Sequence, residues 1–121
     1  MAVILIVEDD VFIREIAVMM IEDWGHDTLS ASDVDEALSL LRSSRHIDAL
    51  FTDIYLKTAV LGGCELAYQA IGLRPRLRVL YTTGNTVTEK MKALFVNGKH
   101  FLCKPYTQHQ LQDSIDGMLA A

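Results

Sequence analysis

The stretch AVILIVEDD, residues 2–10, indicates the fold class because an apolar run rich in β-branched residues ends at three acids. An apolar run without alternation is typical of a strand that is buried on both faces of a sheet. Four further short apolar runs follow along the chain, at residues 28–31, 49–52, 77–82 and 100–103. Amphipathic helical patterns separate them. Strands that alternate with helices in this way predict an α/β fold, a doubly wound five-stranded parallel sheet with five helices.

Signals for helix ends fit this alternation. Gly25 ends the first helical pattern, and Asn97-Gly98 ends the fourth. Capping-box patterns, in which a hydroxyl residue is followed three positions later by an acid or an amide, predict the starts of three helices; they are Ser32–Asp35, Thr86–Glu89 and Thr107–Gln110. In the first helix, Met19 and Met20 are expected to fill the core.

Composition narrows the class of protein. A length of 121 residues favours one domain spanning 1–121, and 11 basic against 16 acidic residues give a net charge of −5, which disfavours a nucleic-acid-binding surface. No apolar run approaches the ~20 residues of a membrane span, and no signal-peptide pattern precedes the first strand. Cys64 and Cys103 lack metal-type spacing, and Cys103 is expected to be an inert core thiol. The sequence thus predicts a soluble, cytoplasmic domain with neither a membrane nor a nucleic-acid partner.

Polar residues follow several of the predicted strands. The first strand ends in Glu8-Asp9-Asp10, the third in Asp53, the fourth in Thr82-Thr83 and the fifth in Lys104. The carboxyl ends of parallel strands meet at one edge of a doubly wound sheet, so these side chains are expected to converge. Clustered carboxylates repel one another unless a cation lies among them, and oxygen ligands beside a phosphate group suit Mg²⁺. The residues predict a Mg²⁺-assisted phosphoryl site, although Asp10 is equally consistent with a cap on the following helix.

Four motifs in order carry a resemblance to a known family. They are Ile6-Val7-Glu8-Asp9-Asp10, Thr52-Asp53-Ile54, Val79-Leu80-Tyr81-Thr82-Thr83-Gly84 and Phe101-Leu102-Cys103-Lys104-Pro105. With these motifs, essentially the whole chain resembles the receiver domains of response regulators in bacterial two-component signalling. The resemblance implies a flavodoxin-like strand order, 2-1-3-4-5. It also implies a stand-alone regulator, because the length leaves no room for an output domain.

The resemblance assigns metal binding and phosphoacceptance to particular residues. Asp53 matches the phosphoacceptor, which takes its phosphoryl group from a histidine kinase or a histidine phosphotransfer protein. Glu8 and Asp9 match the acidic pair that binds Mg²⁺ together with Asp53. The backbone carbonyl of Tyr55 matches a further metal ligand.

The remaining matches concern the phosphoryl group and the signal. Thr83 and Lys104 match the hydroxyl and the ammonium group that contact phosphoryl oxygens. Thr83 and Phe101 match a switch pair, in which the aromatic ring changes rotamer on activation. Output is expected through onward phosphorelay or through a protein target at the face formed by helix 4, strand 5 and helix 5, around Lys90, Lys99, Phe101 and Tyr106.

Two departures from the family pattern stand in the loop after Asp53. Lys57 occupies a position that is commonly proline, and the loop of residues 54–63 is a residue or two longer than usual. Within this loop, the Tyr55 ring is expected to shield the phosphoryl group from water. The chain is then expected to catalyse its own phosphorylation and a slow self-dephosphorylation, with no other enzymatic activity.

Two other functions stay open at the level of sequence. A Mg²⁺-dependent phosphohydrolase on a similar sheet would need Asp-x-Asp after the first strand, where this chain has Glu8-Asp9-Asp10. A receiver-like scaffold that is never phosphorylated would not need Asp53, Thr83 and Lys104 together.

Overall fold

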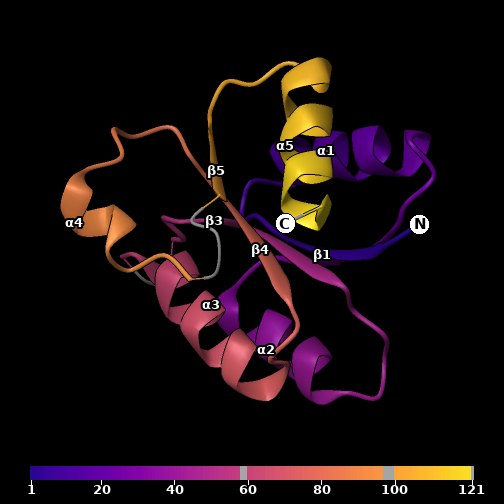
Figure 1. Cartoon of the computed structure of the whole chain (residues 1–121), viewed down its shortest axis with the longest axis horizontal. Coiled ribbons are helices and arrows are strands. Elements are labelled where there is room, and N and C mark those ends of the chain that lie inside the picture. The colour runs from indigo at the N-terminus through magenta and orange to yellow at the C-terminus, as the bar shows by residue number, and fades with distance from the viewer. Residues whose placement is uncertain (58–59, 97–99, 121) are drawn as a thin grey trace.

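The computed structural model describes residues 1–57, 60–96 and 100–120. Its five strands form one parallel sheet in the order β2-β1-β3-β4-β5 (Figure 1). The strands are β1 (Val3–Val7), β2 (Asp27–Ala31), β3 (Ala49–Asp53), β4 (Arg78–Thr83) and β5 (His100–Cys103). The predicted fold class and the strand order 2-1-3-4-5 are confirmed.

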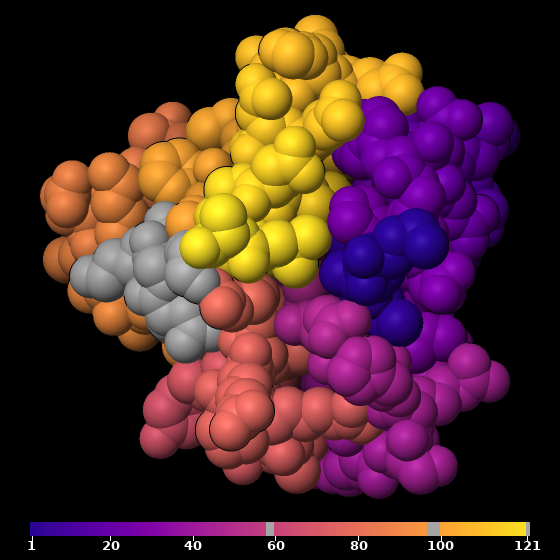
Figure 2. Space-filling model, turned by 45° about the vertical axis from the view of Figure 1, so that its right-hand side comes forward, coloured from indigo at the N-terminus to yellow at the C-terminus, as the bar shows by residue number. Residues whose placement is uncertain are grey.

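Helices cover both faces of the sheet. They are α1 (Val11–Asp23), α2 (Val34–Arg42), α3 (Gly62–Leu73), α4 (Glu89–Lys92) and α5 (Gln108–Ala120). Helices α1 and α5 lie on one face, and α2 and α3 lie on the other (Figure 1). Figure 2 shows α5, in yellow, directly beside α1, in purple. Among the described residues, every helix is too short or too polar to cross a bilayer.

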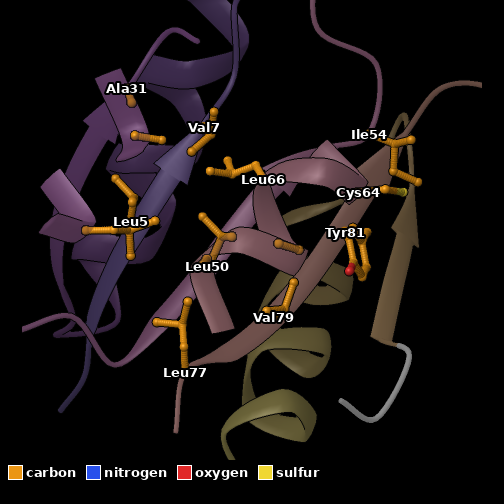
Figure 3. Close-up of a cluster of buried hydrophobic side chains, with 14 of the residues drawn as sticks. Leu5, Val7, Ala31, Leu50, Ile54, Cys64, Leu66, Leu77, Val79 and Tyr81 are labelled. Atoms are coloured by element: carbon orange, nitrogen blue, oxygen red, sulfur yellow. The ribbon is translucent and has the colours of Figure 1, made fainter. Parts of the chain in front are cut away.

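The apolar run of β1 is explained by its two covered faces. Ile4 and Ile6 pack in one hydrophobic cluster with buried residues of α1 and α5. Leu5 and Val7, which point the opposite way, pack in a second cluster with buried residues of α2 and α3 (Figure 3). Successive side chains of a strand alternate between faces, so a strand between two helical layers needs apolar residues at every position.

The second helix begins one position later than its predicted capping box. The N-cap is Asp33, whose carboxylate accepts a hydrogen bond of 2.8 Å from the backbone N–H of Glu36. The Glu36 carboxylate in turn accepts one of 2.6 Å from the N–H of Ser32. Serine and aspartate both cap helices well, and here Asp33 is the cap while Glu36 accepts from the N–H of the residue before it.

The fourth helix also begins later than predicted. Its N-cap is Thr88, whose hydroxyl accepts from the N–H of Met91, rather than Thr86. The predicted stop at Asn97-Gly98 lies outside the described residues. The capping box of Thr107 and Gln110 is confirmed, because each residue's side chain accepts a hydrogen bond from the other's backbone N–H.

Two predicted core residues lie at the surface instead. Met19 is 68% exposed because Ala17 and Ile21 occupy the buried stripe of α1. Cys103 is exposed because β5 is an edge strand whose alternate residues point outward. The predicted helix end at Gly25 is confirmed, since its φ of 90° suits glycine directly after α1.

Candidate functional site

Three acids converge at the carboxyl edge of the sheet. Glu8 and Asp9 follow β1, Asp53 ends β3, and one oxygen from each of the three lies within 4.8 Å of the others. Glu8 and Asp53 are only 4% and 6% exposed, whereas Asp9 is half-buried. The parallel pairing of β1 with β3 brings these strand ends together, as the sequence predicted.

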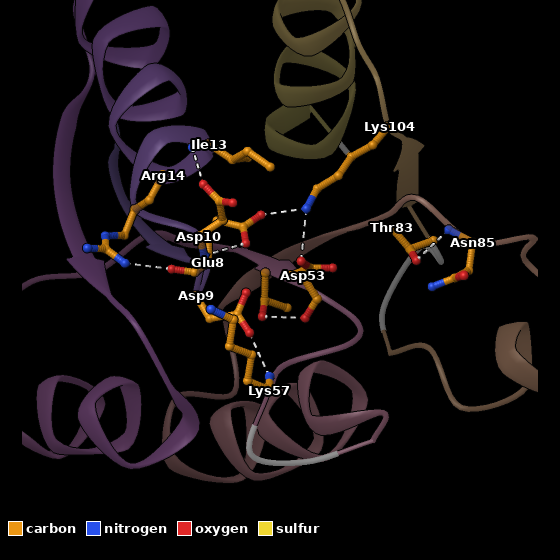
Figure 4. Close-up of polar contacts among 11 residues, drawn as sticks. Glu8, Asp9, Asp10, Ile13, Arg14, Asp53, Lys57, Thr83, Asn85 and Lys104 are labelled. Carbon is orange, nitrogen blue, oxygen red and sulfur yellow. Dashed lines mark hydrogen bonds and ion pairs between the residues drawn. The ribbon is translucent and has the colours of Figure 1, made fainter.

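A lysine from the other side of the sheet joins two of the acids. Lys104, which follows β5, places its Nζ 2.5 Å from Glu8 Oε1 and 2.9 Å from Asp53 Oδ2 (Figure 4). One ammonium group therefore bridges the ends of β1 and β3. The peptide bond between Lys104 and Pro105 is cis.

The charges of this bridge shift one another's protonation. Burial raises the pKa of Glu8 above its ordinary value, even though the hydrogen bond from Lys104 acts in the opposite direction. Burial acts to lower the pKa of Lys104, but the hydrogen bonds to Glu8 and Asp53 outweigh it, and the pKa is raised. Lys104 thus stays charged at neutral pH and offsets part of the negative charge of the acids.

The Asp10 side chain caps a helix and is not one of the three clustered carboxylates. It is the N-cap of α1, and its Oδ1 accepts a hydrogen bond of 3.1 Å from the N–H of Ile13. Its own backbone N–H donates to Glu8 Oε2 at 3.0 Å. Of the two interpretations that the sequence left open for Asp10, the helix cap is the one observed.

Gly63 is a site residue that the sequence patterns did not single out. A Cβ at this position would lie 2.0 Å from the carbonyl oxygen of Asp53, a distance that no side chain can occupy. The Gly63 N–H donates a hydrogen bond of 2.9 Å to the carbonyl of Ile54, so the first turn of α3 rests directly on the end of β3. Glycine permits this close approach, which fixes the backbone that carries Asp53.

Thr83 lies near the acids but contacts a different partner. It is buried at the end of β4, and its hydroxyl oxygen accepts a hydrogen bond of 3.1 Å from the N–H of Asn85. Figure 4 shows this pair to one side of the link between Lys104 and Asp53. The hydroxyl therefore lies at the carboxyl end of β4, and among the described residues it forms no hydrogen bond with Asp53.

The two aromatic residues of interest face α4. The Tyr55 hydroxyl lies 3.9 Å from Met91 Sδ, and its ring packs at the margin of the cluster shared with α2 and α3. Phe101 is 36% exposed on β5. Its ring lies 6.0 Å from that of Phe95 and 5.5 Å from Lys92 Nζ. The ring of Phe101 is thus partly exposed and faces Lys92 of α4.

The donor set suits a hard divalent cation. Carboxylate oxygens are the ligands that Mg²⁺ prefers, and it normally binds through one or two of them together with phosphate oxygens. Three carboxylates within 4.8 Å face a single ammonium group, which leaves an excess of negative charge at the edge of the sheet. The residues Glu8, Asp9 and Asp53 therefore fit a Mg²⁺ ion by chemistry and by proximity.

Comparison with protein families identifies this arrangement. The family model for the response regulator receiver domain matches residues 4–116. The chain belongs to this family. Receiver domains are modules of two-component systems that bind Mg²⁺ at an acidic pocket, and they are typically signalling modules rather than enzymes.

Individual relatives agree with the family. Over 109 residues, this receiver domain is 30% identical to the nitrogen assimilation regulatory protein NtrX of Azorhizobium caulinodans, a match that covers 89% of this chain and 24% of NtrX. The chemotaxis protein CheY4 of Vibrio cholerae is 26% identical with a TM-score of 0.85, and the match covers 98% of this chain and 99% of that chain. A response regulator receiver protein of Sinorhizobium medicae, 24% identical, shares the fold with a TM-score of 0.89 over 99% and 95% of the two chains. The receiver domain thus spans about a quarter of NtrX and nearly all of CheY4.

Proposed function

We propose that this receiver domain accepts a phosphoryl group on Asp53 from the phosphohistidine of a histidine kinase or a histidine phosphotransfer protein. The observation that carries the proposal is the contact of 2.9 Å between Lys104 Nζ and Asp53 Oδ2, beside Glu8 and Asp9. In the transfer, a carboxylate oxygen of Asp53 bonds to phosphorus, while the bond from phosphorus to the imidazole nitrogen breaks and its electron pair stays on the imidazole.

Each site residue has a physical role in this proposal. Glu8, Asp9 and Asp53, with the backbone carbonyl of Tyr55, would hold Mg²⁺. The bound cation neutralises negative charge on the carboxylates and the phosphoryl oxygens. Lys104 contributes a positive charge at Asp53 Oδ2, and charge-assisted hydrogen bonds of this kind are the strong ones.

An exposed apolar face on α1 supports docking of a protein donor. Phe12, Ile16 and Met19 are large apolar residues at helical spacing, and Phe12 is 81% exposed. A groove of about 270 Å³ runs beside them between α1 and the chain after β5, lined by Ile13, Ile16, Met20, Lys104, Pro105 and Tyr106. Exposed apolar patches next to a reactive group mark protein contacts. We propose that a helix of the donor protein packs here, with its phosphohistidine directed to Asp53.

The output of the domain is proposed to be a protein contact or an onward phosphorelay. The face formed by α4, β5 and α5 carries exposed Lys90 and half-exposed Phe101, whereas the Tyr106 ring packs against Phe51 at 6.2 Å between centroids. Lys99, which the resemblance also placed here, lies outside the described residues. The cation–π contact between Lys92 and Phe101 joins α4 to β5, so a movement of either element alters this contact with the other.

A small-molecule phosphodonor tests phosphoacceptance without the cognate kinase. The protein is incubated with Mg²⁺ and acetyl phosphate, and its intact mass is measured. We expect one added phosphoryl group in the wild type and none in Asp53→Asn, which preserves shape and removes the nucleophilic carboxylate. Asp48→Asn is a matched control, because Asp48 lies at the opposite edge of the sheet, before β3. Labelling of Asp53→Asn, or labelling of the wild type in excess chelator, would refute the proposal.

The lifetime of the phosphoryl group is a further part of this proposal. Slow self-dephosphorylation requires that a side chain restrict the approach of water, and Tyr55 is a bulky residue two positions beyond Asp53. Its contact with Met91 directs the hydroxyl toward α4, so any shielding is by the ring. We expect faster decay of phosphorylated Tyr55→Ala than of the wild type after donor removal, with Tyr55→Phe unchanged. Equal lifetimes in all three proteins would show that the ring does not shield the site.

A further inference from the structure

The loop after β3 holds one of the site acids through its backbone. The N–H of Lys57 donates a hydrogen bond of 2.6 Å to Asp9 Oδ2, a contact between residues 48 positions apart in sequence (Figure 4). Among the described residues, this is the single hydrogen bond that the Asp9 carboxylate accepts. Its other oxygen, Oδ1, therefore stays available to a cation.

The contact at position 57 requires a backbone N–H and does not depend on the side chain. The Lys57 side chain is exposed and takes no part, because the bond comes from the main chain. Any residue with a backbone N–H can form it, whereas proline has none. Position 57 is also where the sequence departs from the receiver pattern, in which proline is common.

The bond from Lys57 opposes the electrostatic repulsion that acts on the Asp9 carboxylate. Asp9 is half-buried beside two other carboxylates and has no ammonium partner among the described residues, since Lys104 pairs with Glu8 and Asp53. Repulsion from those acids favours rotation of the Asp9 side chain toward solvent. A hydrogen bond from a backbone N–H to a carboxylate stabilises the ionised form and fixes its orientation.

We propose that the backbone N–H of Lys57 is a positioning donor that holds Asp9 ready to bind the divalent cation. The inference rests on the proposed function, because it assumes that the acid cluster binds Mg²⁺. It adds that the loop conformation at Lys57 and cation binding at Asp9 are coupled. Such coupling is reciprocal, so the cation also changes the order of this loop.

Two substitutions at one position separate the backbone donor from the side chain. Lys57→Ala removes the charge and keeps the N–H, while Lys57→Pro removes both. Mg²⁺ affinity is measured by isothermal titration calorimetry on the metal-free proteins. We expect Lys57→Ala to bind Mg²⁺ within about twofold of the wild type, and Lys57→Pro to bind about tenfold more weakly, as is typical when a partner of a metal ligand is lost. Equal affinities of the two variants would overturn the inference.

A second measurement needs no metal and does not depend on Lys57→Pro folding. Hydrogen exchange of the Lys57 amide is followed by NMR in the wild type, Asp9→Asn and Asp9→Ala. We expect exchange in Asp9→Ala to be about tenfold faster than in the wild type, with Asp9→Asn between them because its amide oxygen still accepts. Equal exchange in all three would overturn the inference. A wild type that shows amide protection but binds no Mg²⁺ would refute the proposed function, whereas Mg²⁺ binding without amide protection refutes only the role of Lys57.

Discussion

Asp9→Asn is expected to stabilise the metal-free protein and to abolish its stabilisation by Mg²⁺. The oxygens of Glu8, Asp9 and Asp53 lie within 4.8 Å of one another. At an effective dielectric constant of about 20, two unit charges at this distance repel by about 3 to 4 kcal/mol. Lys104 offsets part of this repulsion, and Asp9 is partly open to solvent, so removal of its charge is expected to gain about 1 kcal/mol. Asparagine keeps the oxygen that accepts the Lys57 N–H.

Stabilisation of the wild type by Mg²⁺ is expected to exceed the stabilisation gained by removing the Asp9 charge. A ligand that binds only the folded state stabilises it by about 2.7 kcal/mol at a hundred times its Kd. The unfolding entropy of a chain of 121 residues is about 0.25 kcal/mol/K, so this energy corresponds to a rise in Tm of about 10 °C. The gain from charge removal corresponds to about 4 °C in the absence of metal.

The assay is thermal unfolding by circular dichroism with chelator or with saturating Mg²⁺. Asp10→Asn is the matched control: it makes the same charge change one residue away, and asparagine still caps α1. We expect the wild type and Asp10→Asn to rise by about 10 °C with Mg²⁺, and Asp9→Asn by less than about 2 °C. An equal rise in Asp9→Asn would place the cation away from the acid cluster and refute the reasoning.

Three further predictions concern the residues around the acids. Gly63→Ala is expected to destabilise the fold by about 1 to 3 kcal/mol in denaturant titrations, because its Cβ would collide with the Asp53 carbonyl, while Gly72→Ala in open space of the same helix should stabilise by up to about 1 kcal/mol. Burial raises the pKa of Glu8, and the hydrogen bond from Lys104 lowers it. Lys104→Ala removes this lowering contribution. A carboxyl whose pKa is raised on folding destabilises the fold as the pH rises above the ordinary glutamate pKa of 4.5, so the deficit of Lys104→Ala relative to the wild type should grow with rising pH above that value, and a constant deficit would contradict this. Thr83→Ala is expected to accept the phosphoryl group yet to lose the phosphorylation-dependent amide shifts of α4 and β5, and identical shifts in both proteins would exclude the coupling.

The sheet and the convergence of its strand-end residues could be predicted from the sequence because both depend on local patterns. A strand covered on both faces needs a continuous apolar run, and β1 has one. Once the strands are parallel, Glu8, Asp53 and Lys104 must meet at one edge wherever the loops run. The resemblance then assigned chemical roles to residues that the topology had already gathered.

The details that could not be predicted depend on contacts between distant segments. The bond between Lys57 and Asp9 joins residues from two loops, and nothing in either segment marks the other as its partner. The close approach of Gly63 to Asp53 is likewise hidden, because a glycine before a helix is also a common turn residue. Cys103 belongs to an apolar run, but its position on an edge strand exposes it. Sequence periodicity identifies a strand without showing which side chains have a layer packed over them.

If Asp53 accepts a phosphoryl group as proposed, Thr83 and Lys104 are the donors that would contact it. The Thr83 hydroxyl accepts a hydrogen bond from the Asn85 N–H and donates none among the described residues, so its proton can be donated to a phosphoryl oxygen without loss of the existing bond. Lys104 differs, because its ammonium is shared between Asp53 and the buried Glu8. Movement of that ammonium toward a phosphoryl oxygen would leave Glu8 without a positive partner, and an unpaired buried carboxylate is costly. Glu8, Asp9 and Asp53 could hold a divalent cation, which would supply positive charge to Glu8 when Lys104 contacts the phosphoryl group. Under the proposed function, a requirement for Mg²⁺ would therefore arise from the burial of Glu8 as much as from the charge of the incoming phosphate.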